Sequence, residues 1–244
     1  MQRVAKMARY LPEFGWNPIV LAASEIPPGF PRDTKLLEEI PEEVKVSRVP
    51  EPRALRSLFT GVRSATAPTD QSAKPSPSSR IKRRLRNCMR GLRDHLLCPD
   101  EQVFWVRPAA AEGIRLARQH AAAAVLSTSG PVSNHLVARR IARVTGLPWV
   151  ADFRDPWVGN IHWRDLPLRR RRREERMEER VLGDASAITC VTKSFCEDYS
   201  ARHPRHPVGL IYNGFDPADY RDLPAPPASD GPPTLVYAGT LYPR

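Results

Sequence analysis

The sequence predicts an α/β fold, a parallel sheet of Rossmann type flanked by helices. Two observations lead to this prediction. From position 103 onward, short apolar runs of strand length alternate with amphipathic segments of helical length, as they do when parallel strands are joined by helical crossovers. Several of the apolar runs also end in small or polar residues and Gly, Pro or Asn, which is typical of buried strands that emerge from a sheet.

The N-terminal segment predicts a helix followed by two short strands. Apolar residues recur at helical spacing over 2–14, and Gly15 ends the pattern. Apolar strands are expected at 17–23 and 44–50, with a loop and one helical turn between them. Alternating folds usually begin with a strand. We therefore expect that a first strand is missing ahead of this helix.

The rest of the chain gives a regular alternation of expected elements. The helix at 168–182 carries Arg and Glu three and four positions apart, which favours a mostly solvated charged face. Ser133 is the expected N-cap of one helix and Gly146 its stop. Helices are expected at 106–121, 132–146, 168–182 and 193–203, and strands at 123–129, 147–153, 186–192 and 208–214.

Composition limits the class of protein. A hydrophobic content of 41% supports a packed core. The chain contains no apolar run of the length that a bilayer span needs and no signal-peptide pattern, so we expect a cytoplasmic protein. The four cysteines are not spaced as metal ligands, and we expect free thiols and no metal. These are Cys88, Cys98, Cys190 and Cys196.

The net charge of +11 indicates an anionic partner. Much of the charge lies at 80–93 and 169–173. The segment 80–97 predicts a basic amphipathic helix, which either packs on its own domain or binds an anionic membrane surface. The low-complexity insert 64–79 predicts disorder. No aromatic residues interleave the basic clusters, which weakens a nucleic-acid interpretation. A non-enzymatic basic module for nucleic acid or anionic membrane is the alternative function.

The stretch WVADFRDPW at 149–157 combines a buried strand with a charged Asp-Pro ending. Ligands of open parallel sheets bind just past the carboxyl ends of strands. Arg154 and Asp155 are therefore either a polar turn or part of a site. Asp152 alternates to the other side of the strand, where a structural hydrogen-bond acceptor is expected.

Several motifs, taken in order, resemble the N-terminal half of a GT-B-fold glycosyltransferase of the retaining family four. The motifs are PEFGWNPIVLAA, STSGPVSNHLVARRIARVTGLPWVADFRDPW, DASAITCVT, IYNGFDPADY and LVYAGTLYPR. The resemblance implies two Rossmann-like domains, with the acceptor bound by the N-terminal one and a nucleotide-sugar by the C-terminal one. It also implies hexosyl transfer without a cofactor or metal, because helix dipoles and basic side chains hold the diphosphate.

The resemblance implies a set of site residues. His135 is also explained by packing, and the Asn-Gly pair by a tight turn that needs a positive φ. The implied catalytic residues are Asp155 and Arg154; the acceptor-binding residues are Ser129, Ser133, His135, Thr192 and Lys193; the donor-binding residues are Gly239, Thr240 and Arg244; the hinge residues are Asn213, Gly214 and Asp216.

The expected organisation is an acceptor domain over 1–222, a proline-rich linker over 223–233 and the start of a donor domain over 234–244, whose first strand runs into Gly239 and Thr240. Because the first strand and most of the donor domain are absent from this pattern, we expect the 244 residues alone to be inactive. The expected acceptor is lipid-linked or an envelope glycan at the inner face of the plasma membrane. We do not expect nucleic acid as a partner.

Overall fold

The computed structural model describes residues 2–25, 35–52, 91, 95–160, 163–221, 231 and 235–237. The chain divides into two compact units, Met1–Asn213 and Gly214–Arg244. The first unit ends before the domain boundary expected at 222. The predicted insert 64–79 lies outside the described residues. Of the predicted helix 80–97, residues 91, 95 and 96 are described as helical.

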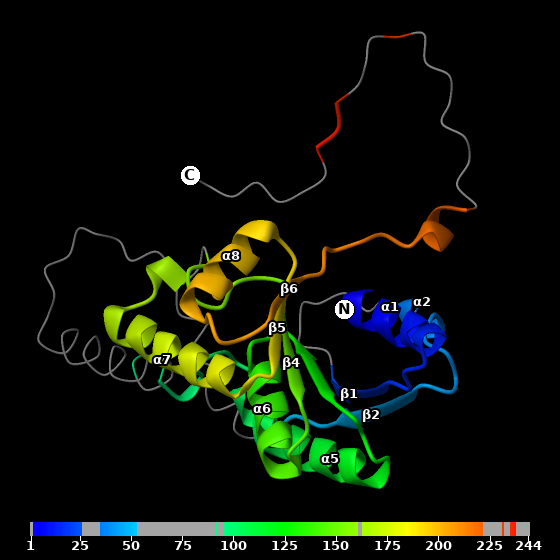
Figure 1. Ribbon diagram of the computed structural model, residues 1–244, viewed down its shortest axis with the longest axis horizontal. Coiled ribbons are helices and arrows are strands. Elements are labelled where there is room, and N and C mark those ends of the chain that lie inside the picture. Colours follow the sequence, from blue (N-terminus) through cyan, green and yellow to red (C-terminus); the bar gives the residue numbers. More distant parts are fainter. Residues whose placement is uncertain are drawn as a thin grey trace, which may run out of the picture. The chain divides into compact units, whose positions relative to one another are not determined.

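The first unit alternates strands and helices much as the sequence predicts (Figure 1). Helix α1 ends in a short 3-10 turn closed by Gly15, whose φ is 79°. The elements are α1 (Gln2–Tyr10), β1 (Ile19–Ala23), α2 (Lys35–Glu38), β2 (Lys45–Val49), α5 (Val106–Gln119), β3 (Val125–Thr128), α6 (Ser133–Thr145), β4 (Trp149–Phe153), α7 (Leu168–Asp184), β5 (Ala187–Cys190), α8 (Lys193–Arg202) and β6 (Val208–Leu210).

The described strands pair in parallel, which confirms the predicted fold class. They form two sheets, a pair β1-β2 and a four-stranded sheet in the order β3-β4-β5-β6. The four-stranded sheet follows chain order, because each strand pairs with the next one along the chain. Strands β1 and β3 do not pair with each other in the described part of the chain, so the strands are divided between two sheets.

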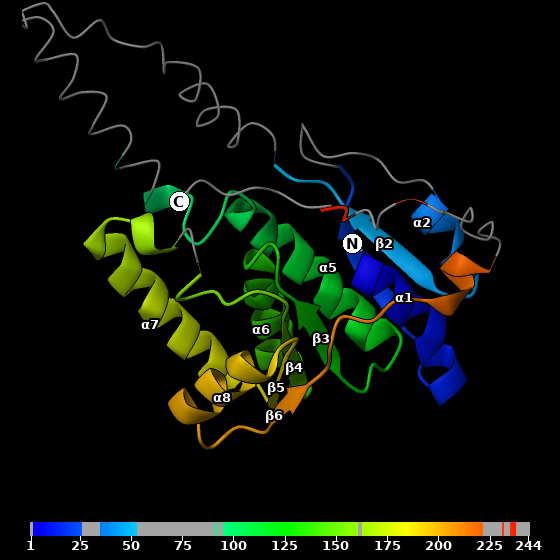
Figure 2. The same cartoon turned by 90° about the horizontal axis from the view of Figure 1, so that it is seen from above.

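The main core lies between the four-stranded sheet and α6, α7 and α8. Trp149, Ala151 and Phe153 alternate along β4, and each is completely buried. They pack with Leu182 of α7 and Tyr199 of α8. Figure 1 and Figure 2 both show α7 and α8 together on one side of the unit and α1 with the β1-β2 pair on the other. Strand alternation therefore gives the sheet one apolar face and one face that carries Asp152.

A second core joins the two sheets beneath α5. Val49 of β2, Ala109 and Ala110 of α5 and Ile141 of α6 are buried together. Gly113 permits the close approach, because a Cβ at this position would lie 2.3 Å from Cδ1 of Ile141. Helices α5 and α6 thus share one packed layer with both sheets.

The second unit contains a short 3-10 helix, Pro217–Tyr220, capped by the Asp216 carboxylate, which accepts the Ala218 amide at 2.9 Å. Residues 235–237 are exposed and are not in a strand, in contrast to the strand predicted there. Among the helices that the structure describes, none is long and apolar enough to cross a bilayer.

Candidate functional site

The carboxyl ends of four parallel strands meet along one edge of the sheet. The register pairs Thr128 with Asp152, Phe153 with Cys190, and Cys190 with Leu210. The segments that follow these strands begin at Ser129, Arg154, Val191 and Ile211, so they lie side by side at this edge. This is where an open parallel sheet binds its ligands.

Arg154 joins the ends of β3 and β4. Its Nε donates to the Ser129 carbonyl at 2.8 Å, and its Nη2 donates to the carbonyls of Ser129 and Gly130. The Arg154 amide in turn donates to Ser129 Oγ at 3.1 Å. Gly130 has a φ of 85°, and a Cβ there would lie 2.8 Å from Arg154 Nη2. Most polar groups of Arg154 and Ser129 thus hold the two strand ends together, and the catalytic role of Arg154 and the acceptor-binding role of Ser129 stay predictions.

Asp155 comes next along the chain, and its side chain is exposed. Its backbone carbonyl accepts a hydrogen bond from Ser129 Oγ at 3.5 Å. Among the described residues, none forms a hydrogen bond or ion pair with the Asp155 carboxylate. The fixed backbone therefore presents a carboxylate that is available to a ligand.

The N-terminus of α6 is occupied by a protein carboxylate. Asp100 accepts the Ser133 amide at 2.8 Å, the Ser133 hydroxyl at 2.5 Å and the Gln102 amide at 3.0 Å. Burial raises the pKa of Asp100 above its ordinary value, and the hydrogen bonds from Ser133 oppose that rise. Ser133 is fully buried. This corrects its prediction as an acceptor-binding residue and as the N-cap, because Asp100 takes the position that a ligand would need.

His135 is also part of the interior. It is fully buried, its Nδ1 lies 2.8 Å from Ser127 Oγ, and its ring centroid lies 4.4 Å from that of Phe153. Trp149 Nε1 donates to the same Ser127 hydroxyl at 2.8 Å. Burial lowers the pKa of His135 to about 3, so the ring stays neutral. The structure favours the packing interpretation of His135 and corrects the acceptor-binding one.

Thr192 and Lys193 follow β5 at the same edge. Thr192 is the N-cap of α8, because its hydroxyl accepts the Phe195 amide at 3.3 Å. The Lys193 side chain is 80% exposed, and its ion pair with Glu197 is long, at 4.0 Å. Exposed ion pairs of this kind contribute little to the stability of the folded protein. Of the predicted acceptor-binding residues, Lys193 is thus the exposed one.

The other face of β4 carries a network that sequence reasoning did not find. Asp152 is fully buried and accepts two bonds from Arg3 of α1, each 2.9 Å, and one from the Thr189 hydroxyl at 2.7 Å. This agrees with its prediction as a structural acceptor. The remaining N–H groups of Arg3 donate to the carbonyls of Ile211 and Tyr212 and to Oδ1 of Asn213.

Two glutamates of α7 hold the loop 154–160 that carries Asp155. Glu174 accepts Trp157 Nε1 at 3.3 Å and Arg170 Nε at 2.8 Å. Glu178 accepts the Val158 amide at 3.2 Å. Glu174 and Glu178 are 4% and 1% exposed, so the charged helix does not have the solvated face that its sequence favoured at these positions.

Glu178 is the central residue of the contact between α7, the loop 154–160 and α8. Tyr199 donates its hydroxyl to Glu178 at 3.1 Å, and Arg202 Nη1 lies 2.6 Å from the other carboxylate oxygen. Burial raises the pKa of Glu178, and Arg202 opposes that rise. The sequence did contain a signal for the burial of Glu174 and Glu178. Positions 174 and 178 lie on the same helix face as the apolar residues Val181 and Leu182.

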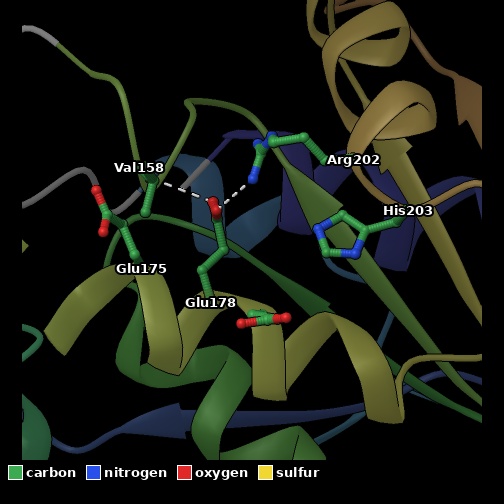
Figure 3. A pocket seen from close by; sticks show the side chains of 6 residues that line it. Val158, Glu175, Glu178, Arg202 and His203 are labelled. Atoms are coloured by element: carbon green, nitrogen blue, oxygen red, sulfur yellow. Dashed lines mark hydrogen bonds and ion pairs between the residues drawn. The ribbon is translucent and has the colours of Figure 1, made fainter. Parts of the chain in front are cut away.

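A cavity of about 390 Å³ lies beside this contact (Figure 3). Figure 3 shows Glu178 directed toward Val158 and Arg202, with His203 opposite. A second cavity of about 340 Å³ shares Val158 and Arg202 and includes Phe195 and Asp198. Neither cavity includes Asp155 or another predicted site residue. Three of the six residues that line the larger cavity are glutamates. The lining residues are Val158, Glu175, Glu178, Glu179, Arg202 and His203.

A comparison with protein families identifies the chain. The model of the family described as Glycosyltransferase Family 4 matches residues 75–219, which is more than half of the sequence. The chain belongs to Glycosyltransferase Family 4. A search of curated proteins finds none that matches it. Family 4 membership confirms the resemblance drawn from the motifs, and the matched range includes Asp155 and Lys193.

The predicted hinge residues of this Family 4 chain have individual roles. Asn213 accepts a hydrogen bond from Arg3 at 3.3 Å. Gly214 is not among the described glycines with positive φ, so the tight-turn explanation is corrected. Asp216 caps the 3-10 helix described above. Gly239, Thr240 and Arg244, predicted to bind the donor, lie outside the described residues.

Proposed function

We propose that the unit Met1–Asn213 binds the acceptor of a glycosyltransferase and presents it at the sheet edge that carries Asp155 and Lys193. Family 4 membership supports the general activity. The observation that supports the site is the exposed Asp155 carboxylate at the end of β4, on a backbone fixed through Ser129 and α7. A fixed backbone limits the motion of a catalytic group, which is what positioning requires.

The proposed reaction moves a hexosyl group from a nucleotide-sugar to an acceptor hydroxyl, with retention at the anomeric carbon. The bond from the anomeric carbon to the diphosphate breaks, a bond to the acceptor oxygen forms, and the hydroxyl proton is released. Asp155 accepts a hydrogen bond from a sugar hydroxyl and stabilises positive charge that develops at the anomeric centre. Lys193 provides an ammonium group suited to an anionic acceptor.

We further propose a lipid-linked or envelope-glycan acceptor at a membrane surface. The net charge of +11 and the basic residues at 80–93 and 169–173 support it, since anionic headgroups attract Lys and Arg at about 1 kcal/mol each. Flotation with anionic and with neutral vesicles tests this part. Preferential binding to anionic vesicles is expected, and equal binding to both, or none, would contradict it.

Acceptor binding tests the proposed site. We expect the chain to bind a member of a panel of lipid-linked and soluble glycans, and Asp155→Asn to weaken that binding by about tenfold or more, since a hydrogen bond to a charged group is worth about 1.5–3 kcal/mol. Glu179→Gln is the matched control, because Glu179 is also exposed but lines the acidic cavity. Unchanged affinity in Asp155→Asn would contradict the site. Steeply salt-dependent binding to duplex DNA, with no glycan bound, would favour the basic-module alternative.

A further inference from the structure

Two cysteines lie together beneath α8, at the sheet edge but on the packed face. Cys190 is the last residue of β5 and is fully buried. Cys196 lies in the first turn of α8, is partly buried and packs against the core cluster that contains Cys190. Cys98, Cys190 and Cys196 are free thiols, as the sequence predicts. Cys88 lies outside the described residues.

Cys196 lies over the end of the β5-β6 pair that contains Cys190. Cys196 Sγ lies 3.5 Å from the Gly209 carbonyl of β6. Gly209 is paired with Thr189, and the next pair along the two strands is Leu210 with Cys190. Cys196 also packs against the buried cluster that contains Cys190. The two thiols are therefore neighbours across the turn from β5 into α8.

We propose that Cys190 and Cys196 form a reversible intramolecular disulfide when the protein meets a hydroperoxide. The thiol of Cys196, the more accessible of the two, loses its proton and attacks the peroxide, which gives a sulfenic acid and one molecule of water or alcohol. The sulfur of Cys190 then attacks the sulfenyl sulfur, and the hydroxyl leaves with the Cys190 proton as water. Two thiols are oxidised and one peroxide bond is reduced.

The surroundings assign the order of these steps. Burial and the neighbouring Cys196 raise the pKa of Cys190 to about 12, so Cys190 stays protonated and reacts slowly with free oxidants. Its reaction with a sulfenic acid on Cys196 is intramolecular and gains from proximity. The closed ring contains Thr192 and Lys193, so oxidation fixes the turn that begins α8.

Peptide mapping of the full 244-residue chain tests the disulfide. The chain is treated with hydrogen peroxide, blocked with iodoacetamide and digested with trypsin. Cleavage after Lys193 separates the two cysteines, so the disulfide appears as peptides 181–193 and 194–202 joined and two hydrogens lighter than their sum. Dithiothreitol should release the two peptides. The matched control Cys98→Ser should give the same yield of the joined pair.

The serine variants test the order of reaction. Cys190→Ser should trap the sulfenic acid on Cys196, with dimedone labelling severalfold above wild type. Cys196→Ser should leave Cys190 unmodified at the same peroxide dose. Circular dichroism confirms that each variant is folded, and Cys190→Ala replaces Cys190→Ser if it is not. A wild-type chain that accumulates dimedone-labelled Cys196 without the joined peptides, or that joins either cysteine to Cys98, would overturn the proposal.

Discussion

Arg3 and Asp152 form a bidentate ion pair across 149 positions of the chain, with two bonds of 2.9 Å. The Asp152 side chain is fully buried and that of Arg3 is 10% exposed. A guanidinium group has five N–H donors, and in Arg3 each has an acceptor. This one side chain therefore connects α1 to the ends of β4 and β6.

Replacing Arg3 should destabilise the protein strongly. Arg3→Ala leaves the buried Asp152 carboxylate with Thr189 as its remaining described partner, and removing one partner of a buried pair costs about 3–5 kcal/mol. Urea unfolding measures the change. Arg115→Ala, which removes an ion pair to Glu112 at the surface, should leave the midpoint nearly unchanged. A wild-type midpoint for Arg3→Ala would contradict this role.

Removing the Glu178 side chain should free the loop that carries Asp155. In Glu178→Ala the Val158 amide loses its acceptor, so its hydrogen exchange should accelerate by about tenfold, equivalent to about 1.4 kcal/mol. Exchange measured by NMR reads this amide directly. Glu179→Ala is the neighbouring control and should leave it unchanged. Equal protection of Val158 in both variants would show that α7 does not hold the loop.

Asp100 should behave as the cap of α6. Asp100→Ala removes the acceptor for the Ser133 amide and hydroxyl, and cap removal costs about 0.5–2 kcal/mol. Asp100→Asn keeps one acceptor oxygen and should lose less stability than Asp100→Ala. Denaturant unfolding of the three proteins gives the ranking. Equal losses in the two variants would indicate that the carboxylate charge, and not the cap geometry, stabilises this end of the helix.

Stability should fall in acid because His135 is buried as the neutral ring. Its pKa is lowered from 6.5 to about 3, so between these values the unfolded chain binds a proton that the folded chain does not. The free energy of unfolding that depends on this group is fully present above pH 6.5. It declines as the pH falls toward 3, by about 2 kcal/mol between pH 6.5 and 4.5. Urea unfolding across this range should show a flatter decline for His135→Asn than for wild type.

A second core variant separates this effect from general loss of stability. Val137→Ala lies on the same helix, is buried and cannot titrate, so it should lower stability at every pH and keep the wild-type slope. If His135→Asn and Val137→Ala have the same slope, the acid dependence does not come from His135.

The sequence was sufficient for the fold class and for most of the described elements of the first unit. Strands and helices repeat with different periods, and the apolar residues of β4 and α6 follow those periods closely enough to place both elements. The division into two sheets was not predicted, because strand periodicity does not reveal which strands are neighbours. The strand expected near 235–237 rested on a short apolar run and on the motif resemblance, and these residues are exposed.

The position of the candidate site could be predicted from the sequence, but the hydrogen-bond partners of its residues could not. The Asp-Pro ending placed Asp155 at the edge of the sheet. The partners of Arg154 and Ser133 were not predictable, because a guanidinium that binds backbone carbonyls leaves no sequence pattern and Asp100 comes from a distant segment. Arg3 is likewise distant from Asp152. Glu174 and Glu178 had a signal, since they continue the face of α7 that carries Val181 and Leu182.

Mapping a bound acceptor onto the chain tests the central proposal most directly. Hydrogen exchange is compared with and without the glycan that binds in the panel. We expect new protection at 129–130, 154–155 and 192–193, where β3, β4 and β5 end, and its loss in Asp155→Asn. Protection confined to α7 and α8 around Glu175, Glu179 and His203 would place the acceptor in the acidic cavity and contradict the proposed site.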